Sequence, residues 1–227
     1  MNTHKGKAAV LWTGGKDSCL ALLEAELSGY EVESLITFSP GDSEFRAHPL
    51  KFMKLQAEAM ERPHYTLEIS EPYKESYEET ISILKEKYGI DLIITGDIAE
   101  IDGQPNWIRE CSKRSGVDLL TPLWGVDRRK HIENIISHKF KIIFSCVKKP
   151  WFTEDWIGRE MDENLLEKLS ELNLELGVDI SGENGEYHTL VLDGPMFKKR
   201  LQIDDYVKRA DDSLMYMDIE KMSLLDK

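Results

Sequence analysis

The chain has 227 residues, 41% of them hydrophobic and 31% charged, a composition typical of a folded globular protein with a sizeable core. Its formal net charge of −13 makes nucleic acid an unlikely partner, because such binders gain affinity from Lys and Arg side chains that neutralise phosphates. No segment predicts a membrane span, and residues 1–7 lack the apolar core of a signal peptide.

The cysteine content predicts a reducing compartment. Cys19, Cys111 and Cys146 are odd in number and widely separated, and they form no C-x-x-C pair. Such usage fits neither a disulfide framework nor a cysteine metal site. We therefore expect a cytoplasmic protein with free thiols.

Apolar runs alternate with amphipathic segments from residue 7 to residue 147, which is the pattern of a parallel sheet covered by helices. Gly29 and Gly89 are placed to end two of the helices. The predicted fold class is α/β, with an open parallel sheet flanked by helices. Strands are expected at residues 7–13, 31–38, 65–69, 91–95 and 140–147, and helices at 17–28, 48–60, 73–88, 102–115 and 127–138.

A last strand is expected near the end of the chain, where apolar and polar residues alternate over residues 214–221. We expect this strand at a sheet edge. An edge offers unpaired N–H and C=O groups to another strand, so a second copy of the chain could pair there in a homodimer.

The most informative motif lies between the first strand and the first helix. Gly14 and Gly15 let the backbone approach an anion closely, and the helix that follows offers unpaired N–H groups at its N-terminus. Lys16 and the Ser18 hydroxyl add a positive charge and a donor. The carboxylate of Asp17 would repel a bare phosphate, so we expect a Mg²⁺–nucleotide here, with Asp17 at the metal.

Two better-known phosphate loops do not fit this segment. A Walker A loop needs four residues between its first glycine and Gly-Lys-Ser/Thr, and that spacing is absent. A Rossmann turn needs a third glycine at the G-x-G-x-x-G spacing, which is also missing.

Two further loops follow predicted strands of the same sheet. Ligands of open α/β sheets bind at the carboxyl ends of the strands, which selects Thr37 with Phe38 and Gly96 with Asp97. We expect backbone groups of the first pair near an adenine ring and the Asp97 carboxylate in the same crevice. His48, which precedes the second helix, is a candidate contact for phosphate or ribose.

A second dense motif covers Ser181–Thr189. Two glycines, two carboxylates, an amide, a phenol, an imidazole and two hydroxyls gather in nine positions, which is more chemistry than a turn requires. The candidate functional residues of this motif are Gly182, Glu183, Asn184, Glu186, Tyr187 and Thr189.

The segment from Thr13 to Ser18 resembles the Ser-Gly-Gly-x-Asp-Ser pyrophosphate loop of the N-type ATP pyrophosphatases. Together with the second motif and Asp193–Phe197, it resembles the diphthine–ammonia ligase family. Pro122–Trp124 and Trp156–Arg159 extend the resemblance, which covers roughly residues 7 to 203.

The resemblance implies a fold of the adenine nucleotide α-hydrolase type over residues 1–147 and a smaller C-terminal α+β domain over residues 148–227. It also implies that ATP activates the carboxylate of diphthine, on elongation factor 2, and that ammonia then forms the amide. Thr13, Gly14, Gly15 and Ser18 would bind ATP, and Lys16 and Asp17 would also act in catalysis. The second motif would bind the acceptor, with Glu183 and Glu186 as catalytic carboxylates.

The motif departs from the family pattern at Asn184 and His188, where relatives usually carry Gly and Glu, so the acceptor stays open. Two other functions remain candidates. One is an RNA-modifying ATP pyrophosphatase, which the acidic charge and the missing cysteine pairs disfavour. The other is an ATP sensor without turnover, which the presence of Lys16, Asp17 and Ser18 disfavours.

Overall fold

The structure is a computed structural model that describes residues 6–41, 45–100 and 105–227. Contacts divide the chain into two compact units. Among the described residues, the first unit contains residues 6–13, 17–41, 62–100 and 105–125, and the second contains residues 14–16, 45–61 and 126–227. The second unit is therefore more than a C-terminal appendage, because it includes three residues of the glycine turn.

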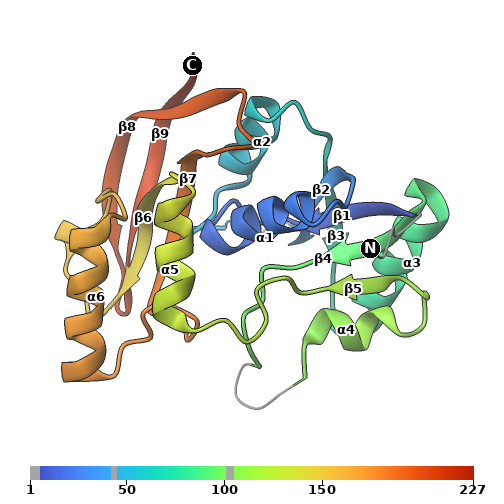
Figure 1. Cartoon of the computed structure of the whole chain (residues 1–227), viewed down its shortest axis with the longest axis horizontal. Coiled ribbons are helices and arrows are strands. Elements are labelled where there is room, and N and C mark those ends of the chain that lie inside the picture. The colour runs from blue at the N-terminus through green and yellow to red at the C-terminus, as the bar shows by residue number, and fades with distance from the viewer. Residues whose placement is uncertain (1–5, 42–44, 101–104) are drawn as a thin grey trace. The chain divides into compact units, whose positions relative to one another are not determined.

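The first unit is built on a five-stranded sheet with the order β3-β2-β1-β4-β5. Every neighbouring pair is parallel, and the order changes direction at β1 (Figure 1). Ligands of open sheets bind near such a change of direction, at the carboxyl ends of the strands. The strands are β1 (Lys7–Leu11), β2 (Val32–Pro40), β3 (His64–Ile69), β4 (Ile90–Ile94) and β5 (Asp118–Leu120).

Three helices belong to this sheet: α1 (Lys16–Leu27), α3 (Tyr73–Tyr88) and α4 (Trp107–Ser112). Helices α3 and α4 pack over one face, where Ala9 of β1 meets Ile81, Leu84 and Cys111 in a buried cluster. Ala8 and Val10 are also buried, and they point to the opposite face because side chains alternate along a strand. Both faces of the sheet are thus covered.

The second unit holds a four-stranded antiparallel sheet with the order β7-β6-β9-β8. Its strands are β6 (Lys141–Lys148), β7 (Tyr187–Asp193), β8 (Lys199–Ala210) and β9 (Leu214–Asp226). Its helices are α2 (Leu50–Ala59), α5 (Arg128–Ser137), α6 (Glu163–Leu176) and the short 3₁₀ helix Glu154–Trp156.

The fold class predicted from the sequence is confirmed, with an open parallel sheet and a separate antiparallel region. The strand expected at 140–147 was assigned to the wrong sheet. As β6 it pairs with β7 on one side and β9 on the other, so the second unit takes in residues from 126 onward rather than from 148. A continuous apolar run predicts a strand buried on both faces, and β6 meets that description inside an antiparallel sheet.

The last strand was expected at an edge, and this was wrong, because β9 lies between β6 and β8. The exposed edge strand is β8, whose register is broken around Asp205 and whose residues include five charged side chains between Lys199 and Lys208. Charges and bulges on an edge strand oppose pairing with another chain. This removes the basis for a homodimer through the final strand.

The helix expected at 102–115 spans Trp107–Ser112, and residues 102–104 lie outside the described part of the chain. The sequence predicts none of β5, β7, β8, α6 or the 3₁₀ helix Glu154–Trp156. No helix in the described ranges is both long and apolar enough to cross a lipid bilayer.

The three thiols provide a test of the packing. Burial raises the pKa of Cys111 and of Cys146 to about 11. The pKa of Cys19 is also raised, mainly by burial and to a smaller extent by the negative charge of Asp17. At pH 8 roughly one such thiol in a thousand is ionised. We expect the native protein to resist iodoacetamide at pH 8, with labelling increasing as the pH approaches 11. Labelling in about 6 M guanidinium, followed by mass spectrometry, provides the unfolded control. Rapid labelling of the native protein at pH 8 would contradict the described cores.

Candidate active site

The glycine turn runs from the end of β1 to the start of α1. Trp12 continues the strand pairing, since its N–H donates to the Ile36 carbonyl at 2.7 Å. Gly14 then adopts a φ of +75°, a conformation that side chains with a Cβ rarely adopt. The glycine is thus required at this position by the backbone itself.

The carbonyl oxygen of Gly14 accepts two hydrogen bonds. Val191 of β7 donates its N–H at 3.1 Å, and the side-chain amide of Gln56 donates at 3.0 Å. The same Gln56 nitrogen lies 2.8 Å from the Val191 carbonyl oxygen. Gln56 belongs to α2 and is completely buried, so a backbone carbonyl of the turn is held by an amide that water does not reach.

This anchoring sets the direction of the next N–H group. Because a trans peptide is planar, its C=O and N–H point in opposite directions. With the Gly14 oxygen held by Gln56 and Val191, the Gly15 N–H is directed away from both. The turn therefore has a fixed orientation before any anion binds.

The next N–H group is held differently. The Lys16 N–H donates to the Thr189 hydroxyl oxygen at 3.1 Å. The Thr189 hydroxyl oxygen, which the sequence predicts to contact the acceptor, thus lies against the turn and ties it to β7.

The Lys16 side chain is only 4% exposed, and its Nζ lies 5.4 Å from the centre of the Tyr187 ring. The ring faces of aromatic residues attract cations. Tyr187 is itself packed against Phe144 at 4.8 Å between ring centres and against Phe152 at 6.0 Å. An aromatic cluster thus supports the ammonium group that the turn supplies.

In the first unit, the start of α1 is fitted closely to the loop after β4. A Cβ on Gly96 would lie 2.6 Å from the Asp17 carbonyl carbon, so Gly96 allows the helix start to approach. Thr13 and Ser18 place their hydroxyl oxygens 3.2 Å apart. Asp17 stands in the first turn of α1.

The other residues selected at this edge of the sheet are engaged in holding it together. The Thr37 hydroxyl donates to the Trp12 carbonyl at 2.7 Å and lies 2.8 Å from His64 Nε2. Phe38 packs edge-on against Tyr77 at 5.1 Å. Asp97 accepts from Thr95 at 2.7 Å and from Asn106 at 2.6 Å.

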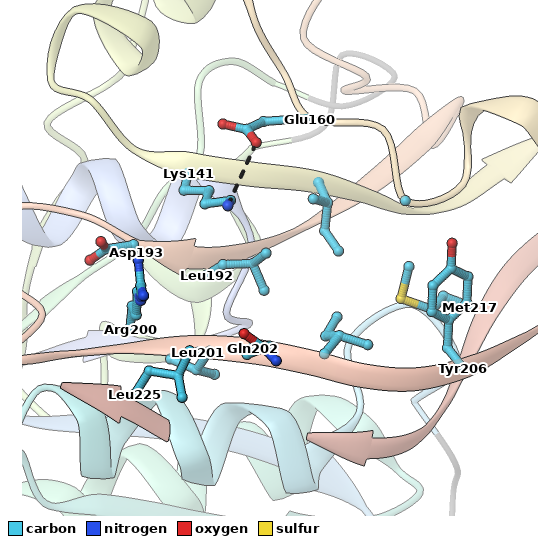
Figure 2. A pocket seen from close by; sticks show the side chains of 13 residues that line it. Lys141, Glu160, Leu192, Asp193, Arg200, Leu201, Gln202, Tyr206, Met217 and Leu225 are labelled. Atoms are coloured by element: carbon cyan, nitrogen blue, oxygen red, sulfur yellow. Dashed lines mark ion pairs between the residues drawn. The ribbon is translucent and has the colours of Figure 1, made fainter. Parts of the chain in front are cut away.

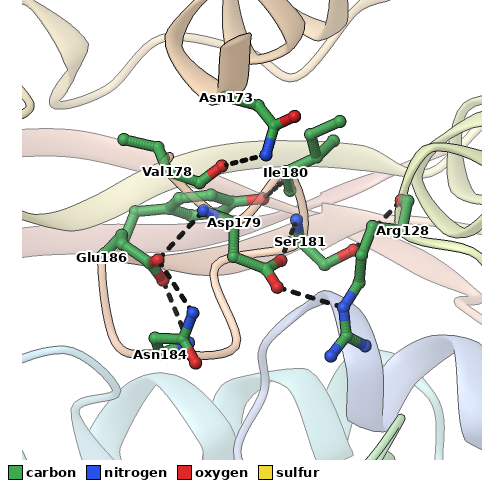
Figure 3. A network of polar contacts seen from close by, with 9 residues as sticks. Arg128, Asn173, Val178, Asp179, Ile180, Ser181, Asn184 and Glu186 are labelled. Atoms are coloured by element: carbon green, nitrogen blue, oxygen red, sulfur yellow. Dashed lines mark hydrogen bonds and ion pairs between the residues drawn. The ribbon is translucent and has the colours of Figure 1, made fainter. Parts of the chain in front are cut away.

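The second motif forms a loop organised around Glu186, which is 2% exposed (Figure 3). Its carboxylate accepts from the N–H groups of Asp179 and Asn184, both at 3.0 Å, and from the Asn184 side chain at 3.2 Å. Three donors thus satisfy this buried carboxylate, and through them Glu186 fixes the conformation of the loop.

The ends of this loop are also fixed. Arg128 forms an ion pair with Asp179 at 3.1 Å, and the Tyr187 hydroxyl donates to the Ile180 carbonyl at 2.6 Å (Figure 3). Gly182 has a φ of +71°, and a Cβ there would lie 2.9 Å from the Tyr187 ring. Of the two candidate carboxylates, Glu183 is the one that keeps a partly exposed position.

His48 lies in the segment before α2 and packs edge-on against His188 of β7, with ring centres 5.2 Å apart. The segment is held by the Ser145 hydroxyl, which donates to the Ala47 carbonyl at 2.8 Å, and by an ion pair between Arg46 and Asp211 at 2.5 Å. His188, which departs from the family pattern, thus neighbours His48, a predicted contact for phosphate or ribose.

A cavity of about 440 Å³ lies elsewhere in the second unit, against its antiparallel sheet (Figure 2). Its lining mixes apolar side chains such as Leu192 and Met217 with charged ones, including Lys141 and Glu160, which form an ion pair at 3.9 Å. None of the candidate binding or catalytic residues lines this cavity, although Gly158 and Asp193, from two segments that carry the family resemblance, do.

Gln56 is the residue that the sequence reasoning missed. The signal was present, because Phe52, Met53 and Gln56 follow the spacing of the buried face of α2. A glutamine at a core position must find hydrogen-bond partners, and here they are the turn and β7.

An open parallel sheet with a glycine turn after β1, together with a separate antiparallel sheet, defines an α/β protein of the open-sheet class. The chain belongs to the diphthamide synthase family, since residues 6–119 match the model of the diphthamide synthase N-terminal domain and residues 127–225 match that of the C-terminal domain.

Similar proteins bear related names. The diphthine–ammonia ligase of Mus musculus is 28% identical, with 87% of this chain and 83% of that protein covered. That of Danio rerio is also 28% identical, with 96% of each covered. A structure described as a predicted subunit of tRNA methyltransferase from Methanocaldococcus jannaschii has a TM-score of 0.48 and 17% identity, with 84% of this chain and 98% of that chain covered.

Gly182 and Gly185 test the packing of the second motif. Both have positive φ values, +71° and +77°, but a Cβ meets the Tyr187 ring only at Gly182 and meets nothing within 4 Å at Gly185. We expect Gly182→Ala to lower the free energy of unfolding by about 1–3 kcal/mol more than Gly185→Ala. Urea denaturation of the two variants measures the difference, and equal losses would contradict the described contact.

Proposed function

We propose that the chain is an AMP-forming ligase that uses ATP to convert a carboxylate into an amide with ammonia, as in the conversion of diphthine to diphthamide on elongation factor 2. The observation that carries the proposal is the match of both halves of the chain to the diphthamide synthase models. The anchored glycine turn supplies a physical basis for the ATP half of the reaction.

The reaction needs two group transfers. A carboxylate oxygen of the acceptor attacks the α-phosphorus of ATP, the bond from that phosphorus to the oxygen bridging to the β-phosphate breaks, and pyrophosphate leaves. The nitrogen of ammonia then attacks the carbonyl carbon of the acyl adenylate, AMP leaves, and the nitrogen gives up a proton. The barrier of the first step is lowered by donors aimed at the departing pyrophosphate.

The turn provides such donors. The Gly15 N–H has its direction set by the Gly14 carbonyl, and the start of α1 adds the positive end of a helix dipole. In our proposal the Lys16 ammonium neutralises pyrophosphate charge, while Thr13 and Ser18 offer hydroxyl groups. The Thr189 hydroxyl oxygen fixes the position of Lys16 by accepting a hydrogen bond from the Lys16 main-chain N–H.

The residues also fit a magnesium ion that arrives with ATP. Among the described residues no three His, Cys, Asp or Glu side chains gather as ligands for a metal ion. Mg²⁺ in nucleotide enzymes is commonly held by substrate phosphates with one or two carboxylates, and Asp17 in the first turn of α1 would be that carboxylate. When bound, the ion supplies charge neutralisation for the phosphates.

On the acceptor side, Glu183 is our candidate to attract ammonium and accept its proton, because it is the partly exposed carboxylate of the second motif. Glu186 holds the loop in place through Asp179 and Asn184, and Gly182 packs against the Tyr187 ring. Gly182, Asn184, Tyr187 and Thr189 remain proposed contacts for the acceptor.

Four residues at the carboxyl edge of the first sheet remain proposed neighbours of the nucleotide, and His48 remains a proposed contact for phosphate or ribose. The four are Thr37, Phe38, Gly96 and Asp97. We propose a cytoplasmic location, where reduced thiols such as the three free cysteines persist.

Product analysis tests this function. The reaction mixture contains ATP labelled at the α-phosphate, Mg²⁺, ammonium and diphthine-bearing elongation factor 2. We expect labelled AMP to form only when the elongation factor is present, and to form equally well after nuclease treatment. Lys16→Ala is expected to lower the rate about 100-fold or more, since the leaving group loses a buried positive charge. Lys168→Ala, on an exposed position of α6, is the matched control.

Labelled ADP as the product, or undiminished AMP formation by Lys16→Ala, would contradict the proposal. AMP formation that is lost on nuclease treatment and depends on tRNA would favour the RNA-modifying alternative instead.

A further inference from the structure

Gln56 occupies a position that neither the family resemblance nor the proposed chemistry assigns. It is fully buried in α2, and one side-chain nitrogen serves two main-chain carbonyls, that of Gly14 at 3.0 Å and that of Val191 at 2.8 Å. Burying a long polar side chain is unfavourable unless its hydrogen bonds are made. A simple core position would have been filled by Leu or Met, so the amide has a specific task.

That task can be identified from the partners. Gly14 lies in the glycine turn, and Val191 lies in β7, two residues beyond Thr189. Val191 and Thr189 each hydrogen-bond to the turn, at 3.1 Å in both cases. β7 is an edge strand, so its outer side is open to these bonds with the turn, and Gln56 of α2 bonds to Gly14 and Val191 at the same place.

The consequence concerns the Gly14–Gly15 peptide. At a φ of +75°, Gly14 has no Cβ to resist rotation, and the peptide could turn its carbonyl toward a bound phosphate, which would repel it. Two donors on the Gly14 oxygen hold the opposite orientation. Removing one of them leaves the Val191 N–H alone to hold the peptide.

We infer that Gln56 is a positioning residue for pyrophosphate recognition, which fixes the Gly14–Gly15 peptide with its N–H directed toward the β- and γ-phosphates of ATP. The inference rests on the proposed function, in that it names how the same site selects a triphosphate. AMP lacks the β- and γ-phosphates that this peptide would bind, so loss of Gln56 is expected to weaken the binding of ATP but not that of AMP.

The test compares the affinities for two ligands. Calorimetry with Mg²⁺ and the non-cleavable analogue α,β-methylene-ATP, and separately with AMP, gives the ratio of the two dissociation constants for each variant. We expect Gln56→Met to lower the preference for the triphosphate about tenfold, with AMP affinity changed less than about twofold. Gln56→Glu should lower it further, since an ionised carboxylate would face two carbonyl oxygens.

Met53→Leu is the matched control, because Met53 lies one turn earlier in α2, is also buried, and can be replaced with little change of volume. It should keep the wild-type ratio. Loss of affinity for both ligands alike in the Gln56 variants would indicate a merely structural role and overturn the inference. So would an unchanged ratio in folded Gln56→Met or Gln56→Glu.

The proposed function is judged on the wild-type protein alone. Wild-type protein that forms AMP while the Gln56 variants keep their preference for the triphosphate would overturn only the inference. Wild-type protein that forms ADP would overturn the proposed function whatever the variants show.

Discussion

The carbonyl oxygen of Gly14 is the point on which the candidate site depends. It accepts from the Val191 N–H and from the Gln56 amide, and the planarity of the peptide then directs the Gly15 N–H to the other side. An anion-binding turn gains affinity when its donors are oriented before the ligand arrives, because no free energy is then spent on ordering them. The glycines that permit a close approach to phosphate also make the turn adaptable, so the orientation must be imposed by neighbours.

The same strand that anchors the turn begins with the residues of the second motif. Tyr187 opens β7 and lies beneath the Lys16 ammonium, Thr189 holds the Lys16 N–H, and Val191 holds Gly14. Alternate residues of one edge strand thus contact two residues of the turn, Lys16 and Gly14, as the twofold repeat of a strand allows. Glu186 directly precedes β7 and fixes the loop before it. The conformations of the second motif and of the turn therefore both depend on β7.

Much of this arrangement could be predicted from the sequence. The alternation of apolar and amphipathic segments predicted the parallel sheet, and Tyr73–Tyr88 was placed with both ends as found, because Gly89 adopts the left-handed conformation that ends a helix. The glycine turn and the second motif were visible from their composition. The apolar run of β6 gave no hint of strand direction, since burial on both faces looks alike in parallel and antiparallel sheets.

The roles of single side chains were harder to predict. The composition of the second motif predicts that Thr189, Tyr187 and Glu186 contact a substrate, and in the structure their polar atoms meet main-chain groups of the protein. The partners of Tyr187 and Glu186 lie seven residues away in the sequence, in a loop whose conformation no periodic pattern predicts, whereas Thr189 meets Lys16 across 173 residues. Gln56 is separated from Val191 by 135 residues, so no local pattern could connect them.

The central claim is that the turn holds the pyrophosphate of ATP with the Gly14 carbonyl anchored away from it. A crystal structure with Mg²⁺ and α,β-methylene-ATP tests this most directly. The account predicts a β- or γ-phosphate oxygen within hydrogen-bond distance of the Gly15 N–H, with the Gly14 oxygen still bonded to Gln56 and Val191. A triphosphate bound at another part of the chain, or a Gly14 carbonyl turned toward the phosphates, would contradict it.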